Sequence, residues 1–226
     1  MAYGLQFTNN SNVVTLDSEY ARLSVIATGR FSPNADSGLG SLTTFPVAAT
    51  SQEPPLVFVR PDTVGGIAGL CMMRLVGGPG NWTGFYVRAY NAITAPPNGR
   101  YFVAAFLAQP VAQYGLAMWD GAGKLLFNSG TPAALFTRAF QNWTYVTTDN
   151  DPQGLYRNYY SVSFDFPENE FLLINSFGMR MVTGGTRGRQ LYCWWDFPNR
   201  KLYAITVALD NPYAFWLPAL FAKMAV

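Results

Sequence analysis

Histidine is absent from this chain of 226 residues, and charged side chains make up only 12% of it, against roughly 25% in a typical soluble domain. Without imidazole, the chain cannot build histidine metal sites, a serine–histidine–aspartate triad or the usual proton shuttle near neutral pH. Several classes of enzyme and metalloprotein are therefore excluded. The shortage of charge also means that something other than ionised groups covers much of the surface.

Lysine is scarce as well, because it occurs only at Lys124, Lys201 and Lys223 and the other basic residues are arginines. The net charge is +2 and the basic residues are scattered, which argues against a nucleic-acid partner, since such proteins carry a basic stripe. Arginine and aromatic residues, the latter at 16%, are enriched where proteins contact one another. The composition therefore favours a homo-oligomer or a part of a larger assembly over a monomer with an uncharged polar coat.

Cysteine occurs only at Cys71 and Cys193, which are far apart and outside any metal-ligand spacing. We expect two buried free thiols in a reducing compartment rather than a disulfide. The first residues lack the basic start and the apolar run of a secretory signal, so the sequence predicts synthesis and folding in the cytoplasm.

Motifs for phosphate binding and for nucleophilic catalysis are also lacking, since neither a phosphate-binding loop nor a nucleophile elbow occurs. Residues 184–189 are rich in glycine but have neither the lysine nor the following helix of a phosphate loop. We interpret them as a hairpin tip whose Arg187 and Arg189 contact an anionic sugar or a neighbouring carboxylate.

Glycoside hydrolysis requires two carboxylates on either side of the scissile bond. The richest acidic stretch contains Asp165, Glu168 and Glu170, but it surrounds a turn and its spacing does not force two acids together. We therefore predict that the chain is not an enzyme and needs no cofactor or metal. Polysaccharide cleavage by Glu168 and Glu170 remains the catalytic alternative.

The chain does contain an internal repeat. Residues 3–18, YGLQFTNNSNVVTLDS, return without a gap as residues 114–129, YGLAMWDGAGKLLFNS. Each copy has two apolar strands around a turn rich in asparagine or glycine, which is typical of a β-hairpin. A looser similarity relates residues 97–110 to residues 198–212. The repeats predict two related halves, 1–112 and 113–226, which can pack as one domain.

Short apolar segments separated by glycine and proline follow each hairpin. They predict strands at 20–26, 56–59, 69–76, 82–90, 100–107, 134–140, 159–166, 170–174, 178–182, 190–196 and 201–209. Residues 29–51 are rich in glycine, serine, threonine and proline and predict a long loop. Because no long segment keeps a helical period, we expect an all-β fold with very little helix, an antiparallel sandwich resembling a jelly roll.

Two aromatic features are candidates for contact with other molecules. Trp194 and Trp195 are adjacent, so in a strand they lie on opposite faces and one of them is exposed or at an interface. We take Trp195 as the candidate.

The second feature is the apolar C-terminal segment, residues 211–226, which is too short to span a bilayer and contains two prolines, so we expect no membrane insertion. It forms either a last strand on its own domain or an arm on a neighbouring subunit. Phe215, Trp216 and Phe221 are its candidate contact residues.

The first hairpin begins with Tyr3-Gly4-Leu5, has Asn9 and Asn10 at its turn and ends at Leu16-Asp17-Ser18. It resembles the start of small tail proteins of tailed bacteriophages, found among tail-tip and tail-fibre components. The second hairpin is similar to a motif that recurs inside such proteins, but it carries Trp119 and Asn128 where the first has Thr8 and Asp17.

The resemblance implies a non-enzymatic, β-rich and homo-oligomeric part of the virion tail that binds other tail proteins or contacts the host. A trimer would suit a fibre-like element, because three sandwiches around an axis bury apolar faces. The alternative is a module that binds a receptor or carbohydrate on the host surface through Trp195, Arg187 or Arg189.

Overall fold

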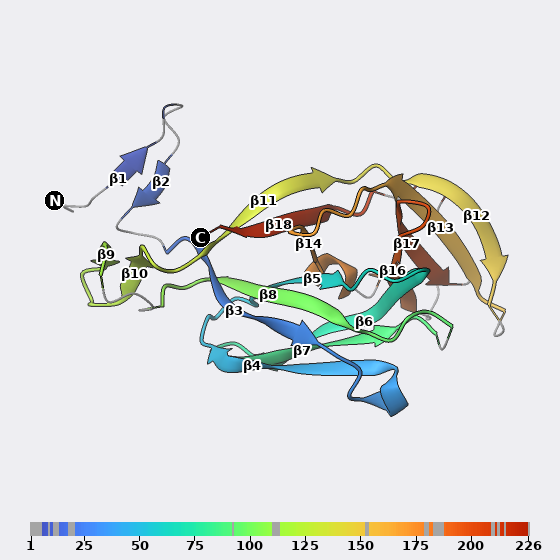
Figure 1. Cartoon of the computed structure of the whole chain (residues 1–226), viewed down its shortest axis with the longest axis horizontal. Coiled ribbons are helices and arrows are strands. Elements are labelled where there is room, and N and C mark those ends of the chain that lie inside the picture. The colour runs from blue at the N-terminus through green and yellow to red at the C-terminus, as the bar shows by residue number, and fades with distance from the viewer. Residues whose placement is uncertain are drawn as a thin grey trace.

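The computed structural model describes residues 6–8, 10, 14–17, 21–91, 93–109, 114–151, 154–178, 181–182, 188–208, 211, 213–214 and 216–225. Nearly all regular structure in this part of the chain is antiparallel strand, which confirms the all-β prediction (Figure 1). The helical structure described consists of two short 3-10 turns, η1 (Asp36–Gly38) and η2 (Asn175–Gly178).

Six strands form a closed barrel. Their order is β11 (Ala133–Phe140), β18 (Ala219–Ala225), β14 (Phe171–Leu173), β5 (Leu56–Pro61), β8 (Gly99–Phe106) and β3 (Leu23–Phe31). The barrel closes where β3 meets β11, through the pairing of Ser24 with Ala133 and a hydrogen bond from the Val25 N–H to the Pro132 carbonyl.

The other strands of the body form one large antiparallel sheet. Their order is β12 (Thr144–Asn150), β13 (Tyr156–Ser163), β17 (Lys201–Ala208), β16 (Gly188–Asp196), β6 (Ile67–Gly78), β7 (Asn81–Ala89) and β4 (Gly40–Ala49), and β15 (Met181–Val182) pairs with β16. The sheet includes two strands outside the predicted ones, β4 within the expected loop 29–51 and β12.

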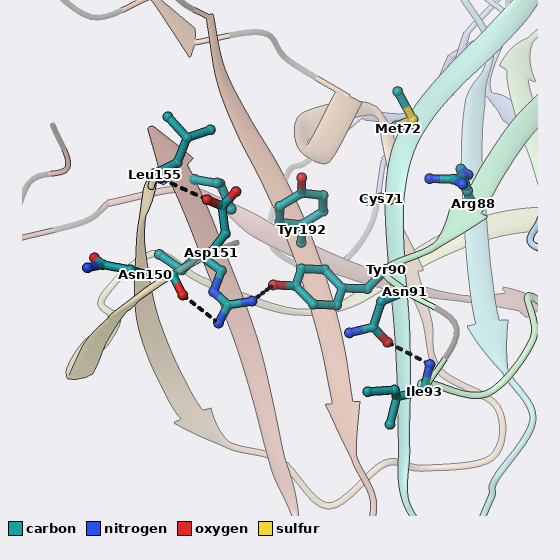
Figure 2. Close-up of a pocket in the computed structure, with 12 residues that line it drawn as sticks. Cys71, Met72, Arg88, Tyr90, Asn91, Ile93, Asn150, Asp151, Leu155 and Tyr192 are labelled. Atoms are coloured by element: carbon teal, nitrogen blue, oxygen red, sulfur yellow. Dashed lines mark hydrogen bonds between the residues drawn. The ribbon is translucent and has the colours of Figure 1, made fainter. Parts of the chain in front are cut away.

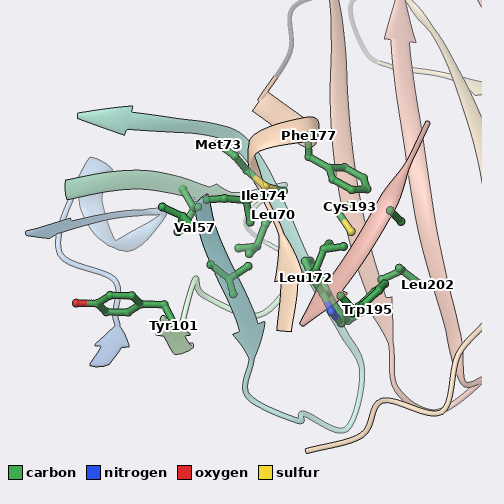
Figure 3. Close-up of a cluster of buried hydrophobic side chains, with 14 of the residues drawn as sticks. Val57, Leu70, Met73, Tyr101, Leu172, Ile174, Phe177, Cys193, Trp195 and Leu202 are labelled. Carbon is green, nitrogen blue, oxygen red and sulfur yellow. The ribbon is translucent and has the colours of Figure 1, made fainter. Parts of the chain in front are cut away.

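The main hydrophobic core fills the space between the barrel and the large sheet. Side chains on successive positions of a strand alternate between its two faces. Val57 and Val59 of β5 accordingly belong to this core, with Leu172 from the barrel and Cys193 from the sheet (Figure 3). Phe58, between the two valines, belongs instead to a second cluster, where its ring stacks on Phe102 at 4.6 Å.

The order of the strands repeats between the two halves of the chain. In the barrel, β3, β8 and β5 of the first half mirror β11, β18 and β14 of the second, and β5 pairs with β14 where the halves meet. In the sheet, β4, β7 and β6 mirror β13, β17 and β16, and β6 pairs with β16. The two related halves therefore share both sheets and one core, and β12 is an additional strand at the edge.

The repeated segments form the two predicted hairpins, β1 (Gln6–Thr8) with β2 (Val14–Asp17) and β9 (Ala117–Trp119) with β10 (Leu125–Asn128). The register is the same in both, because Phe7 pairs with Leu16 as Met118 pairs with Phe127, and a bulge follows this pair in each.

The equivalence extends into the barrel. The β3–β8 pair has a bulge at Ile26 and the β11–β18 pair has one at Thr137. When the alignment of the two hairpins is continued along the chain, Ile26 is aligned with Thr137. The looser similarity between residues 97–110 and 198–212 was wrong as a structural equivalence. It relates β8 of the barrel to β17 of the sheet, whereas the counterpart of β8 in the strand order is β18.

In the part of the chain described here, no helix is long and apolar enough to cross a membrane.

Candidate functional site

The structure reverses the assignment of the two adjacent tryptophans. They do lie on opposite faces of β16, as predicted, but Trp195 is only 2% exposed and packs in the main core with Cys193. Trp194 is the partly exposed one, on the outer face of the large sheet. The register of β16 against β6 and β17 decides which of the two faces the core. Trp195 is thus a core residue and not a contact residue.

The candidate contact residues of the C-terminal segment differ in their exposure to solvent. Phe221 is 1% exposed because β18 is a barrel strand between β11 and β14 and the Phe221 side chain packs in the main core, where its ring stacks on Phe164 at 4.5 Å. Residues 219–225 are therefore a last strand on their own domain, and Phe221 is not an exposed contact. Trp216 is 66% exposed and remains available.

Two of the predicted contact residues, Arg187 and Phe215, lie outside the described residues. Arg189 lies in β16, where its backbone pairs with Met181 of β15.

The outer face of the large sheet carries a cluster of aromatic side chains that we call the outer aromatic face. It consists of Tyr90, Tyr159, Tyr192, Trp194 and Tyr203. Ring centroids of Tyr90 lie 4.8 Å from Tyr192 and 4.9 Å from Trp194, both edge to face. All five side chains are partly exposed, and they cover Ile205, which is fully buried although it lies on the outer side of the sheet.

Gly69 makes room for this cluster. It pairs with Trp194 across the β6–β16 register, and a Cβ at residue 69 would lie 2.8 Å from the Trp194 Cδ1. Its carbonyl also accepts the N–H of Tyr90 at 3.0 Å, which brings Tyr90 from the end of β7 onto the same face. A side chain at position 69 would therefore push Trp194 off the sheet.

Arg157 of β13 ties the aromatic face together. Its guanidinium binds both carboxylate oxygens of Asp149, with Nε to Oδ1 at 2.6 Å and Nη2 to Oδ2 at 2.7 Å, and Nη1 donates to the Tyr90 hydroxyl at 3.1 Å. The hydrogen bond to Asp149 is the main cause that raises the pKa of Arg157. The Tyr159 hydroxyl also donates to Asp149, at 3.3 Å. This ion pair is thus internally satisfied.

A pocket of about 750 Å³ adjoins the outer aromatic face (Figure 2). This volume lies in the range of small-molecule sites, roughly 300 to 1,000 Å³. Tyr192 and Tyr90 lie in the middle, with Arg88 and Met72 on one side and the β12–β13 turn, which carries Leu155, on the other.

The lining of the pocket includes both apolar and hydrogen-bonding groups. Ile93 is 93% exposed and Met72 is 54% exposed. The Asn91 Oδ1 accepts the N–H groups of Ile93 and Thr94 at 2.9 Å each, so its Nδ2 lies on the opposite side of the amide. Asp151 Oδ1 accepts the Leu155 N–H at 2.8 Å and shapes the turn.

Two ionisable groups of the pocket have raised pKa values, and Arg88 has an acidic neighbour. Burial raises the pKa of Tyr192, and burial raises the pKa of the Cys71 thiol to about 12. Arg88 lies near an acid, with its Nε 3.6 Å from Asp36 Oδ2. Near neutral pH the tyrosine therefore offers a hydroxyl and the thiol is not a nucleophile, so the pocket is suited to binding rather than to covalent chemistry.

The acidic stretch at 165–170 serves the fold. Arg138 bridges Asp165 at 2.9 Å and Glu170 at 3.0 Å, and its hydrogen bond to Asp165 lowers the pKa of that carboxyl. A glycosidase acid needs a raised pKa, so Asp165 does not fit that role. The backbone carbonyl of Glu168 accepts a hydrogen bond from Arg100 at 3.0 Å. Among the described residues, no cluster of cysteine, aspartate and glutamate could hold a metal ion.

A second exposed area lies on the β9–β10 hairpin and on residues 114–116 just before it, at the end of the body where the barrel closes (Figure 1). Arg22, just before β3, fixes the hairpin by lying over the Phe127 ring at 4.7 Å and donating to the Thr131 carbonyl at 2.5 Å. Three large apolar side chains are exposed in this area. We call it the hairpin patch, and its members are Tyr114, Leu116 and Trp119.

Comparisons with protein-family models, with curated proteins and with solved structures found no match to this chain.

Proposed function

We propose that this chain is a homo-oligomeric structural component of a bacteriophage tail, at the tail tip or in a tail fibre. The observation that carries the proposal is the pair of hairpins of identical register outside both main sheets, of which the second presents the hairpin patch. Within that patch, Tyr114 is 90% exposed and Trp119 is 57% exposed. Exposed aromatic groups are typical of protein interfaces.

The low charge of the chain supports the same proposal. Further apolar side chains are exposed on the barrel strands, including Phe106 at 59% and Phe136 at 52%. Contact with sister subunits would remove these groups from water, at about 25 cal/mol for each Å² of apolar surface buried. We favour a trimer, with the hairpin patch between subunits or against another tail protein.

The test compares oligomeric state by light scattering coupled to size exclusion. We expect an oligomer for the natural chain and a shift toward monomer for the double variant Leu116→Ser, Trp119→Ser. The matched control is Leu42→Ser, Val47→Ser on β4, which also changes two exposed apolar side chains, 46% and 68% exposed. A monomer at high concentration, together with the absence of this chain from purified virions, would count against the proposal.

A second function, contact with a carbohydrate of the host surface, is favoured by the outer aromatic face and its pocket. Aromatic rings present broad apolar faces with polar edges, and such groups suit sugars. Both functions can belong to one tail protein. The residues that favour the second function are Tyr90, Tyr192 and Trp194, in place of the Trp195 expected from the sequence.

A further inference from the structure

We propose that the pocket beside the outer aromatic face binds an uncharged saccharide, through Tyr192, Asn91 and Arg88. The inference rests on the second function above and names its ligand class and its site. It can fail while the structural role in the tail holds.

The shape and the walls of the pocket fit a sugar ring. The pocket is open to solvent on one side of the sheet and is walled by Tyr192, Met72 and Ile93, which offer apolar surface to the C–H faces of a ring (Figure 2). The Tyr192 ring is held in place by its edge-to-face contact with Tyr90 at 4.8 Å. The aromatic wall is therefore preorganised, and little side-chain entropy is lost on binding.

The hydrogen-bonding groups of the pocket match adjacent hydroxyl groups. Asn91 is oriented by the two N–H groups that its Oδ1 accepts, and Figure 2 shows its nitrogen turned away from that loop, toward the pocket. Arg88 contributes guanidinium donors to the lining, on the same side of Tyr192 as Met72 (Figure 2). Amide and guanidinium groups are planar and carry two or more donors, so each can bind two neighbouring oxygens.

The charge balance favours an uncharged ligand over an anionic one. The two guanidinium groups of the pocket already have acidic neighbours, Arg157 with both oxygens of Asp149 and Arg88 with Asp36 at 3.6 Å. Asp151 adds a carboxylate to the lining. A phosphate or sugar acid would compete with Asp149 and Asp36 and would be repelled by Asp151.

The experiment measures binding by ligand-observed NMR and calorimetry, with lactose, maltotriose and chitotriose as uncharged probes and sialyllactose as the anionic one. We expect at least one uncharged probe to bind and sialyllactose to bind no better than lactose. Asn91→Asp keeps the oxygen that shapes the loop but replaces the donor with an acceptor, so we expect the Kd of the bound probe to rise about tenfold, the loss of one good hydrogen bond. Arg88→Gln is expected to weaken binding similarly.

Asn142→Asp is the matched control, because it makes the same change at an exposed position between β11 and β12, and it should leave the Kd unchanged. Thermal unfolding of each variant shows that the fold is retained. The proposal is overturned if none of the uncharged probes binds the natural chain, if Asn91→Asp and Arg88→Gln bind as well as the control, or if only the anionic probe binds. If the natural chain forms oligomers but binds no sugar, this inference alone is overturned. If the chain forms no oligomers and is absent from virions, that result counts against the structural role instead.

Discussion

At the scale of single residues, the outer aromatic face depends on how closely Trp194 approaches the backbone of β6. Trp194 can lie against β6 only because residue 69 has no Cβ. The tyrosines around it come from β7, β13, β16 and β17, so the cluster depends on the register of the whole sheet. A single methyl group at position 69 therefore acts on several aromatic contacts at once.

We predict that Gly69→Ala lowers the free energy of unfolding by about 1 to 3 kcal/mol, the usual cost of forcing an extra carbon into a packed site. Gly65→Ala is the control, because a Cβ there would meet no heavy atom within 4 Å, and it should change stability by less than about 0.5 kcal/mol. Denaturant titration measures both. Equal stability of the two variants would mean that Trp194 does not need this space.

The buried thiols give a prediction about pH. Burial raises the pKa of the Cys71 thiol to about 12 and also raises that of the Cys193 thiol. Between pH 9 and 12 the unfolded chain loses these protons and the folded chain keeps that of Cys71, so the free energy of unfolding falls as pH rises through this window. The double variant Cys71→Ser, Cys193→Ser tests whether the thiols cause this fall. Its stability should fall less steeply with pH than that of the natural chain in denaturant titrations from pH 8 to pH 10.

At the scale of elements, the equivalent strands β13 and β4 of the large sheet differ in what lies on their outer side. In the second half of the chain, β12 covers the outer side of β13. At the equivalent edge in the first half, the amide of Asn34 takes the place of a strand, since its Nδ2 donates to the Leu42 carbonyl at 2.9 Å and its Oδ1 accepts the Leu42 N–H at 2.8 Å. Pro46 further along β4 has no N–H to offer. Such devices prevent edge-to-edge association.

We predict that Asn34→Ala lowers stability by about 1 to 2 kcal/mol, because two exposed hydrogen bonds are lost, and that it promotes aggregation through the open β4 edge. Turbidity and light scattering over time at high concentration provide the measurement. Asn142→Ala, at an exposed position between β11 and β12, serves as control. An Asn34 variant that is as soluble and as stable as the control would contradict this role of the amide.

At the scale of the whole molecule, the two related halves share both sheets and one core. The pairs β5–β14 and β6–β16 join them, and the main core takes Val57 and Leu70 from the first half and Leu172 and Cys193 from the second. Each half alone would therefore expose half of a core and the strand edges that pair across the halves at β3–β11, β5–β14 and β6–β16.

We predict that a fragment of residues 1–112 does not unfold cooperatively as a monomer, and that mixing it with residues 113–226 restores a cooperative transition. Circular dichroism during thermal unfolding, together with light scattering, would measure this. A fragment that associates with itself would agree with the internal symmetry, since β5 and β6 would pair with their own copies. Cooperative unfolding of a monomeric 1–112 fragment would contradict the shared core.

The sequence by itself determined the all-β class, the two hairpins and most strands, because apolar periods, glycine and proline act locally. It did not reveal β4, whose Ser41 and Thr43 are buried polar residues, or β12, an edge strand with mostly exposed side chains. β4 pairs with β7, which is distant in the chain, whereas β12 pairs with β13, the strand that follows it, and both carry little apolar alternation of their own.

Only the tertiary structure decided the candidate site. Alternation places Trp194 and Trp195 on opposite faces, but the pairing of β16 with β6 and β17 selects Trp194 as the outer one. The same pairing brings Tyr90, Tyr159 and Tyr192 together, because strand register in a sheet is set by long-range contacts and not by the local sequence.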